Sequence, residues 1–193
     1  SVAAFNSPAI EYIITAFMLV GGINFSMLYF IVKLKFNKVF QNEEFNTYIA
    51  VLMGVAVIIG VVLYNTEGSS IEKSFRDSIF QVVTIITTTG FSTVNYAAWS
   101  PFAYMLIILL MFTGGSAGST AGGVKIVRHI LILKNGYYEF KRLLHPRALV
   151  PVRINGKVVS QQIVYNVLAF FFIYLLSFVL GAVIISAFGY DIV

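Results

Sequence analysis

The sequence contains no cysteine and few charges. Its 193 residues are only 11% charged but 59% hydrophobic, and the mean hydropathy is +0.87. A soluble domain carries about 25% charged residues, so this chain has too few to cover a globular surface. The composition indicates an integral membrane protein and argues against a soluble enzyme, a disordered segment or a partner made of nucleic acid.

Two absences narrow the chemistry further. Without cysteine there is neither a disulfide framework nor a cysteine-based metal site. The longest uncharged stretch, 78–124, also contains no His. Its hydroxyl groups therefore lack a base that would activate them. We expect no enzymatic activity, no organic cofactor and no metal beyond a transported ion.

Four uncharged stretches dominate the chain: 12–32, 45–66, 78–124 and 158–190. A spanning helix needs about 20 apolar residues, so the first, second and fourth stretches each predict one spanning helix. The third is too long for one span. It begins with a short apolar run, 79–86, that rises only about 12 Å before a polar Thr/Gly run. This segment is predicted to enter the membrane and turn back.

The rest of the third stretch returns inward. Trp99-Ser100-Pro101 marks a membrane interface and a helix start, and an apolar run follows as far as a glycine-rich break. Lysines and arginines gather after the first stretch and after this break, and such loops face the cytoplasm. We therefore predict that Lys33–Glu44 and Arg128–Gln162 are cytoplasmic and that Glu67–Asp77 and Asp191 are external. A small hairpin is expected around Asn155-Gly156.

The polar run after the half-length helix has the features of a cation filter. Non-helical backbone at membrane depth is tolerated only where it is buried in protein or lines a water-filled path. The negative end of the preceding helix dipole favours a cation, and backbone carbonyls replace the ion's hydration shell. The predicted ion-binding residues are Thr88, Thr89, Gly90 and Phe91. The structural alternative is a polar turn between two packed helices.

The glycine-rich break is the second motif. A continuous helix would lose about 1 kcal/mol for each Gly relative to Ala, so the helix is predicted to break here. A phosphate-binding loop requires Gly-Lys-Ser/Thr, and Val124 separates Gly123 from Lys125. Close packing of small residues is one remaining explanation, and a loop below the filter that obstructs the pore is the other. The predicted gating-loop residues are Gly114, Gly115, Ser116, Gly118, Gly122, Gly123 and Lys125.

Together these motifs resemble the Trk/Ktr/HKT superfamily of potassium transporters, most closely its bacterial TrkH-type membrane subunit. The run 87–93 looks like one of four filter segments, and 114–128 looks like the intramembrane gating loop of the third repeat. The resemblance implies an all-α integral membrane fold of helix–re-entrant pore loop–helix repeats, potassium-channel-like, with a broken second helix. It implies potassium uptake across the cytoplasmic (inner) membrane.

The resemblance also implies an organisation and partners. Residues 1–40 would hold the last transmembrane helix of a preceding repeat, 41–148 one complete repeat, and 149–193 the connection and first helix of the next. The chain starts at Ser1 without an initiator Met and stops at Val193, so we expect a fragment carrying one quarter of the filter. Implied partners are the lipid membrane, the other repeats of the same parent chain, a second copy in a homodimer, and a cytoplasmic nucleotide-binding regulatory subunit.

One alternative function accounts for part of the pattern. A solute carrier with a helix broken at the membrane midplane would bind an anionic substrate at the glycine-rich break. It leaves the separate Thr/Gly loop unexplained. Asn24, in the middle of the first stretch, is expected to hydrogen-bond between helices rather than line a pore.

Overall fold

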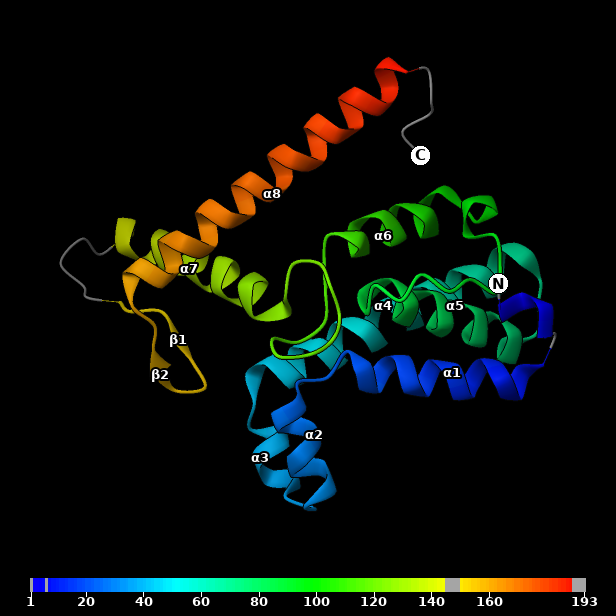
Figure 1. Ribbon diagram of the computed structural model, residues 1–193, viewed down its shortest axis with the longest axis horizontal. Helices are drawn as coiled ribbons and strands as arrows, with labels where there is room; N and C mark the ends of the chain where they lie inside the picture. Colours follow the sequence, from blue (N-terminus) through cyan, green and yellow to red (C-terminus); the bar gives the residue numbers. More distant parts are fainter. Residues whose placement is uncertain (1, 6, 145–149, 189–193) are drawn as a thin grey trace. The chain divides into compact units, whose positions relative to one another are not determined.

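A computed structural model of the chain describes residues 2–5, 7–144 and 150–188, and these form two units, Ser1–His129 and Ile130–Val193 (Figure 1). Predicted positions at 145–149 and Asp191 lie outside the described residues. The elements in chain order are η1 (Val2–Phe5), α1 (Pro8–Gly21), α2 (Phe25–Val32), α3 (Phe36–Phe40), α4 (Glu43–Glu67), α5 (Ile71–Ile86), η2 (Tyr96–Ala98), α6 (Pro101–Met111), α7 (Ile126–Leu144), β1 (Arg153–Ile154), β2 (Lys157–Val158) and α8 (Gln161–Ala187).

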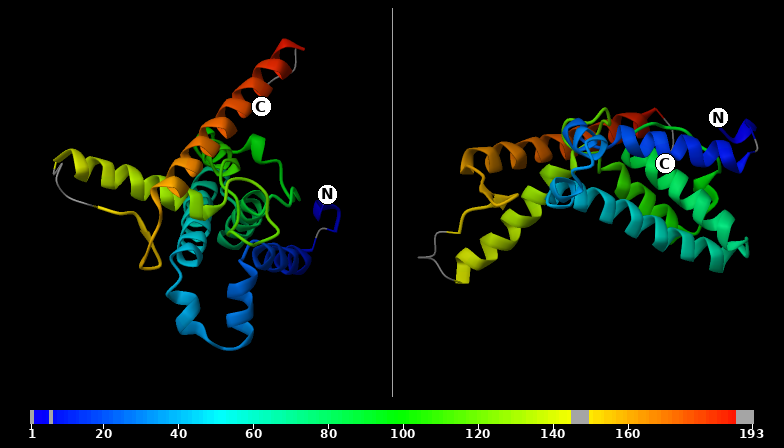
Figure 2. Two further views of the ribbon diagram at one scale, coloured as in Figure 1. Left: turned by 60° about the vertical axis from the view of Figure 1, so that its left-hand side comes forward. Right: turned by 90° about the horizontal axis from the view of Figure 1, so that it is seen from below.

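The first unit is built around α5, which packs against α1 and α4 (Figures 1 and 2). One face of α4 is buried at helical spacing, through Tyr48, Leu52, Ala56, Ile59 and Leu63. This face meets the buried side chains of α5, among them Phe80, Val83 and Ile86. Because the two helices lie close together, the hydroxyl of Ser78 donates to the carbonyl of Ala56 at 2.9 Å. The core therefore fixes the half-length helix from which the re-entrant loop emerges.

Two helices among the described residues are long and apolar enough to cross a membrane, α4 and α8. They match the second and fourth predicted spans. The pair α1 and α2 together would provide a third, but the two helices meet at a bend of 112°. By length, α5 and α6 fall short of a full span, as a helix that enters the membrane and turns back requires.

The single helix predicted over 12–32 is wrong, because the chain breaks there. Gly22 ends α1, and Asn24 caps α2 by accepting a hydrogen bond from the Ser26 amide at 2.7 Å. Gly22 also has no room for a side chain, since a Cβ there would meet the Tyr48 hydroxyl. The Gly-Gly pair and the following Asn are ordinary turn and cap residues, and they outweigh the apolar character of the run.

The predicted helix–loop–helix order from α5 to α7 is confirmed. Helix α5 ends at Ile86, and the chain then runs without helix until η2. Ser100 caps α6, with Pro101 as its first residue. Helix α6 ends at Met111, and α7 begins only at Ile126, so the second helix is broken at the glycine-rich segment.

The second unit contains the rest of α7, a short hairpin and α8. Strands β1 and β2 pair antiparallel through a turn at Asn155-Gly156, where both residues have positive φ (50° and 74°). This is the hairpin expected from the sequence. A small core of Leu131, Val152 and Val164 joins the three parts of the unit. Lys134 adds a hydrogen bond to the carbonyl of Arg153 at 2.9 Å.

Candidate functional site

The Thr/Gly segment leaves α5 in an irregular conformation. The amides of Thr88 and Thr89 still donate to the last carbonyls of the helix, those of Ile85 and Thr84, at 3.0 and 2.9 Å. Thr88 and Gly90 have positive φ (53° and 80°), whereas Thr89 between them does not. A threonine in this region is uncommon, so the surroundings must hold it there. All four predicted filter residues, Thr88 to Phe91, are exposed on this unit.

Hydroxyl groups fix the start of this segment. Thr87 donates to the carbonyl of Val83 at 2.7 Å, which leaves its oxygen free to accept from the Thr89 hydroxyl, also at 2.7 Å. The Thr88 hydroxyl points elsewhere and accepts from the backbone amide of Gly122 at 2.7 Å. Three consecutive threonines thus anchor the segment to α5 on one side and to the glycine-rich loop on the other.

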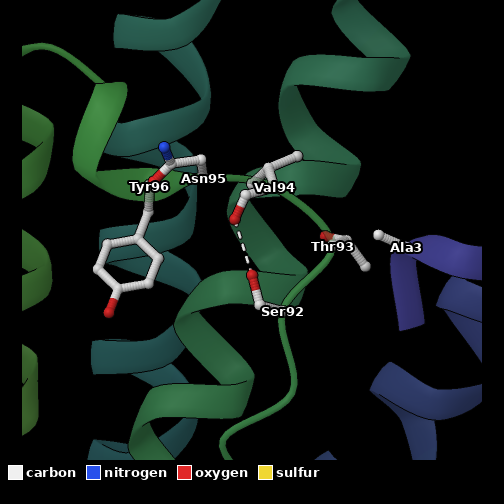
Figure 3. A pocket seen from close by; sticks show the side chains of 6 residues that line it. All are labelled: Ala3, Ser92, Thr93, Val94, Asn95 and Tyr96. Atoms are coloured by element: carbon white, nitrogen blue, oxygen red, sulfur yellow. Dashed lines mark hydrogen bonds between the residues drawn. The ribbon is translucent and has the colours of Figure 1, made fainter. Parts of the chain in front are cut away.

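Two pockets adjoin the segment. One of about 370 Å³ lies on the stretch that leads from the Thr/Gly segment to η2 (Figure 3), where the Ser92 hydroxyl donates to the Val94 carbonyl at 2.7 Å and Ala3 faces Thr93. The other, of about 380 Å³, is lined by Gln81, Thr84, Ile85, Thr88, Gly90, Phe91, Ser92, Tyr96 and Met111. Gln81 and Thr84 are buried, and each has a side-chain oxygen without a hydrogen-bond partner among the described residues.

The glycine-rich loop closes on itself at its base. The Gly114 amide donates to the Val124 carbonyl at 2.8 Å, and the Ile126 amide to the Gly115 carbonyl at 3.2 Å. A Cβ on Gly114 would collide with the backbone carbonyl of Gly122. Gly118 and Gly123 have positive φ (70° and 68°), a conformation glycine adopts at little cost. The glycines therefore serve a tight, defined loop rather than close packing of two straight helices.

The loop docks on the break between α1 and α2. The Ser116 amide donates to the Gly22 carbonyl at 2.9 Å, and the Thr120 hydroxyl donates to the Gly21 carbonyl at 2.9 Å. In return, the Asn24 side-chain amide donates to the Ala117 carbonyl. Helix breaks expose unpaired backbone groups. Here the break between α1 and α2 and the glycine-rich loop, about a hundred residues apart in sequence, provide hydrogen-bond partners for each other's backbone. Asn24 was expected to hydrogen-bond between helices, but its side-chain partner is a carbonyl of the glycine-rich loop.

A carboxylate holds the other side of the loop. Glu44, in the first turn of α4, is 8% exposed and accepts a hydrogen bond from the Ala117 amide at 2.5 Å. The carboxylate also faces the backbone of Val127, in the first turn of α7, and attracts the charge of Lys125. The Lys125 ammonium itself donates to the loop carbonyls of Ala121 and Ser119. The loop is therefore held by Glu44 of α4 and by its own Lys125.

The structure brings together most of the residues that the sequence singled out. The predicted filter and the predicted gating loop meet through Thr88 and Gly122. Two partners of the loop were missed. The Gly21-Gly22-Asn24 break carries a recognisable turn signal, whereas Glu44 carries none, because its partner Ala117 lies 73 residues away.

Comparisons with known proteins show the family to which the chain belongs. The sequence profile of the TrkH family, described as a cation transport protein, matches residues 1–193. The Trk system potassium uptake protein TrkH of Escherichia coli (strain K12) is 35% identical over 193 residues, which cover 99% of this chain and 40% of that protein. The corresponding TrkH of Halomonas elongata is 37% identical with the same coverage.

A solved structure is also similar. The crystal structure of the potassium transporter TrkH from Vibrio parahaemolyticus matches with a TM-score of 0.89 and 33% sequence identity, covering 99% of this chain and 42% of that chain. This chain thus spans about two fifths of the length of these relatives. Because the family profile extends over all of its residues, the chain belongs to the TrkH family of cation transport proteins.

Proposed function

We propose that this chain is part of the pore-forming subunit of a potassium uptake protein of the cytoplasmic membrane. It supplies one quarter of the selectivity filter, Thr88 to Phe91, and an intramembrane gating loop, Gly114 to Gly123. One observation carries the proposal above the others: the first residue of the re-entrant segment is hydrogen-bonded to the glycine-rich loop, through Thr88 and Gly122 at 2.7 Å. A filter and a gate must lie in series along one path, and this contact joins them.

The backbone of the re-entrant segment supports the filter assignment. Thr88 and Gly90 have positive φ, whereas Thr89 between them does not, and we infer from this alternation that successive carbonyls of the segment turn toward the same side. A row of carbonyls on one side is the arrangement that replaces a hydration shell. The segment follows the carboxyl end of α5, whose dipole favours a cation. Its exposed face is where the other three filter segments of the parent would complete the ring.

The glycine-rich loop suits a gate because it is ordered without being part of a helix. Its contacts to Gly22, Asn24 and Thr88 are single hydrogen bonds, and Gly21 accepts two from Thr120. Each such bond is worth about 1 kcal/mol net. These bonds hold the loop in place beneath the filter, and breaking them to release the loop costs little free energy. Potassium is the transported ion, and no organic cofactor or enzymatic step is involved.

The same contacts disfavour an anionic substrate at the break. An anion would need free backbone amides in the loop. Those of Ser116, Ala117 and Gly122 already donate to Gly22, Glu44 and Thr88. The buried carboxylate of Glu44 would also repel an anion.

The remaining organisation is proposed on the same basis. Residues 1–40 close one repeat, 41–148 form a complete repeat, and 149–193 lead into the next. Lys33–Glu44 and Arg128–Gln162 face the cytoplasm, while Glu67–Asp77 and Asp191 are external. The parent assembles as a homodimer, and its basic cytoplasmic face binds a nucleotide-binding regulatory subunit.

Shortening the loop tests the gate. Deleting residues 117–121 from the full-length protein removes the contacts to Glu44, Asn24 and Gly21. We expect potassium uptake per molecule to rise at least about tenfold, because the hydrogen bonds lost are together worth more than the 1.4 kcal/mol of a tenfold change. Uptake is measured in cells that lack their own potassium uptake systems, at equal membrane abundance. Unchanged or slower uptake would contradict the gating role.

A further inference from the structure

Glu44 is the only carboxylate among the hydrogen bonds that hold the glycine-rich loop in the described structure. It lies at the start of α4, directly after the polar connection that carries Lys33, Lys35 and Lys38. At 8% exposure it is nearly out of contact with solvent. A carboxylate in such a place is costly unless its oxygens are hydrogen-bonded, so its position implies a specific task.

The contacts of Glu44 show what that task is. One oxygen accepts from the Ala117 amide, at the tip of the glycine-rich loop, at 2.5 Å. The carboxylate also faces the backbone of Val127 in the first turn of α7, where helix amides lack partners within the helix. It stands within the electrostatic reach of Lys125. One side chain thus joins the start of α4, the tip of the loop and the start of the helix after the loop.

We propose that Glu44 is a positioning residue that latches the glycine-rich loop in its obstructing position. The inference rests on the proposed gating function of the loop. A hydrogen bond to a charged acceptor is about twice as strong as one between neutral groups, so Glu44 is the strongest single attachment of the loop tip. Since Glu44 belongs to α4, a shift of the start of that helix releases the loop tip at Ala117.

The latch predicts faster transport when the carboxylate is removed. Replacing Glu44→Gln in the full-length protein, within the intact transport system, takes away the charge that strengthens the hydrogen bond from Ala117 and attracts Lys125. We expect potassium uptake to rise about tenfold, the change that corresponds to exchanging a charge-assisted hydrogen bond for a neutral one and losing this attraction. Glu43→Gln is the matched control: it removes the same charge one residue away, from a side chain that takes no part in the loop contacts above, and it should leave uptake within about twofold of wild type.

A combination of variants separates the latch from a purely structural role. In protein that also lacks residues 117–121, the latch has nothing to hold, so adding Glu44→Gln should change uptake little. If Glu44 only stabilised the start of α7 through Val127, its effect would persist in that background. Equal effects in the two backgrounds would therefore overturn the proposal.

The remaining outcomes are also decisive. If Glu44→Gln fails to reach the membrane, Glu44→Asp replaces it, because the side chain that is shorter by one methylene keeps the charge but falls short of the Ala117 amide; it too should speed uptake. Suppose that loop shortening speeds uptake, but the Glu44 variant that reaches the membrane takes up potassium at the wild-type rate. This result would overturn the proposed role of Glu44. If loop shortening has no effect, the gating function fails, and the latch fails with it.

Discussion

Replacing Gly90→Asp in the full-length protein is expected to reduce potassium uptake at least about a hundredfold while leaving the protein in the membrane. The backbone at Gly90 has φ +80°, and a Cβ there meets nothing within 4 Å. Asp is among the residues that best tolerate positive φ, so folding should survive. The new carboxylate would bind a cation about 4 Å away by about 4 kcal/mol at an effective dielectric constant near 20. Conduction requires sites weak enough for the ion to leave.

Gly68→Asp is the matched control for this experiment. Gly68 also has positive φ (62°) and open space around its missing side chain, but it lies between α4 and α5, outside the Thr/Gly segment. The same charge introduced there should leave uptake near wild type. Equal loss of uptake in both variants would show that the effect comes from charge or folding rather than from the ion path.

Replacing Gly114→Ala is expected to spread the base of the glycine-rich loop and destabilise the protein. The new methyl group would collide with the Gly122 carbonyl and lie 3.1 Å from the Gly123 carbonyl carbon. Both are backbone atoms, so no side chain can turn aside. Overpacking of this kind costs about 1–3 kcal/mol or more, and it strains the hydrogen bond from Gly114 to Val124. The purified full-length protein should unfold at a lower temperature than wild type.

The control for Gly114→Ala is Gly136→Ala. Gly136 lies within α7, and a Cβ there meets nothing within 4 Å among the described residues. Alanine is favoured over glycine inside a helix by about 1 kcal/mol, so this variant should unfold at the same temperature as wild type or higher. A Gly114→Ala protein as stable as the Gly136→Ala protein would mean that the loop base is not closed as described.

Much of this fold can be predicted from the sequence where the signal is local. The half-length apolar run before the threonines, the Ser100-Pro101 start of α6 and the Asn155-Gly156 turn each depend on residues close together in the chain. The same holds for the break at the glycine-rich segment, where helix propensity alone disfavours a continuous helix. Each of these features appears in the structure.

Hydrogen bonds between segments that lie far apart in the chain could not be predicted from the sequence. The sequence does not predict the break at Gly22, because the apolar run 12–32 is long enough to span a membrane and contains only two glycines and an asparagine. Its purpose becomes apparent only from Ser116 and Thr120, which lie about a hundred residues further along and bond to its carbonyls. Nor does the sequence around Glu44, the second residue of α4, indicate that its side chain bonds to the loop. Such contacts leave no periodicity or spacing in the sequence.

The most direct test of the central claim is the ratio of potassium to sodium permeability of the full-length protein in lipid vesicles, compared between wild type and Gly90→Ala. The added methyl group has open space around it, so the substitution acts on the backbone alone, where a positive φ costs alanine about 1–2 kcal/mol. If the carbonyls around Gly90 hold the ion, the ratio should fall about tenfold, as 1.4 kcal/mol implies. An unchanged ratio, with the same amount of protein in the vesicles, would contradict the assignment of Thr88 to Phe91 as a filter.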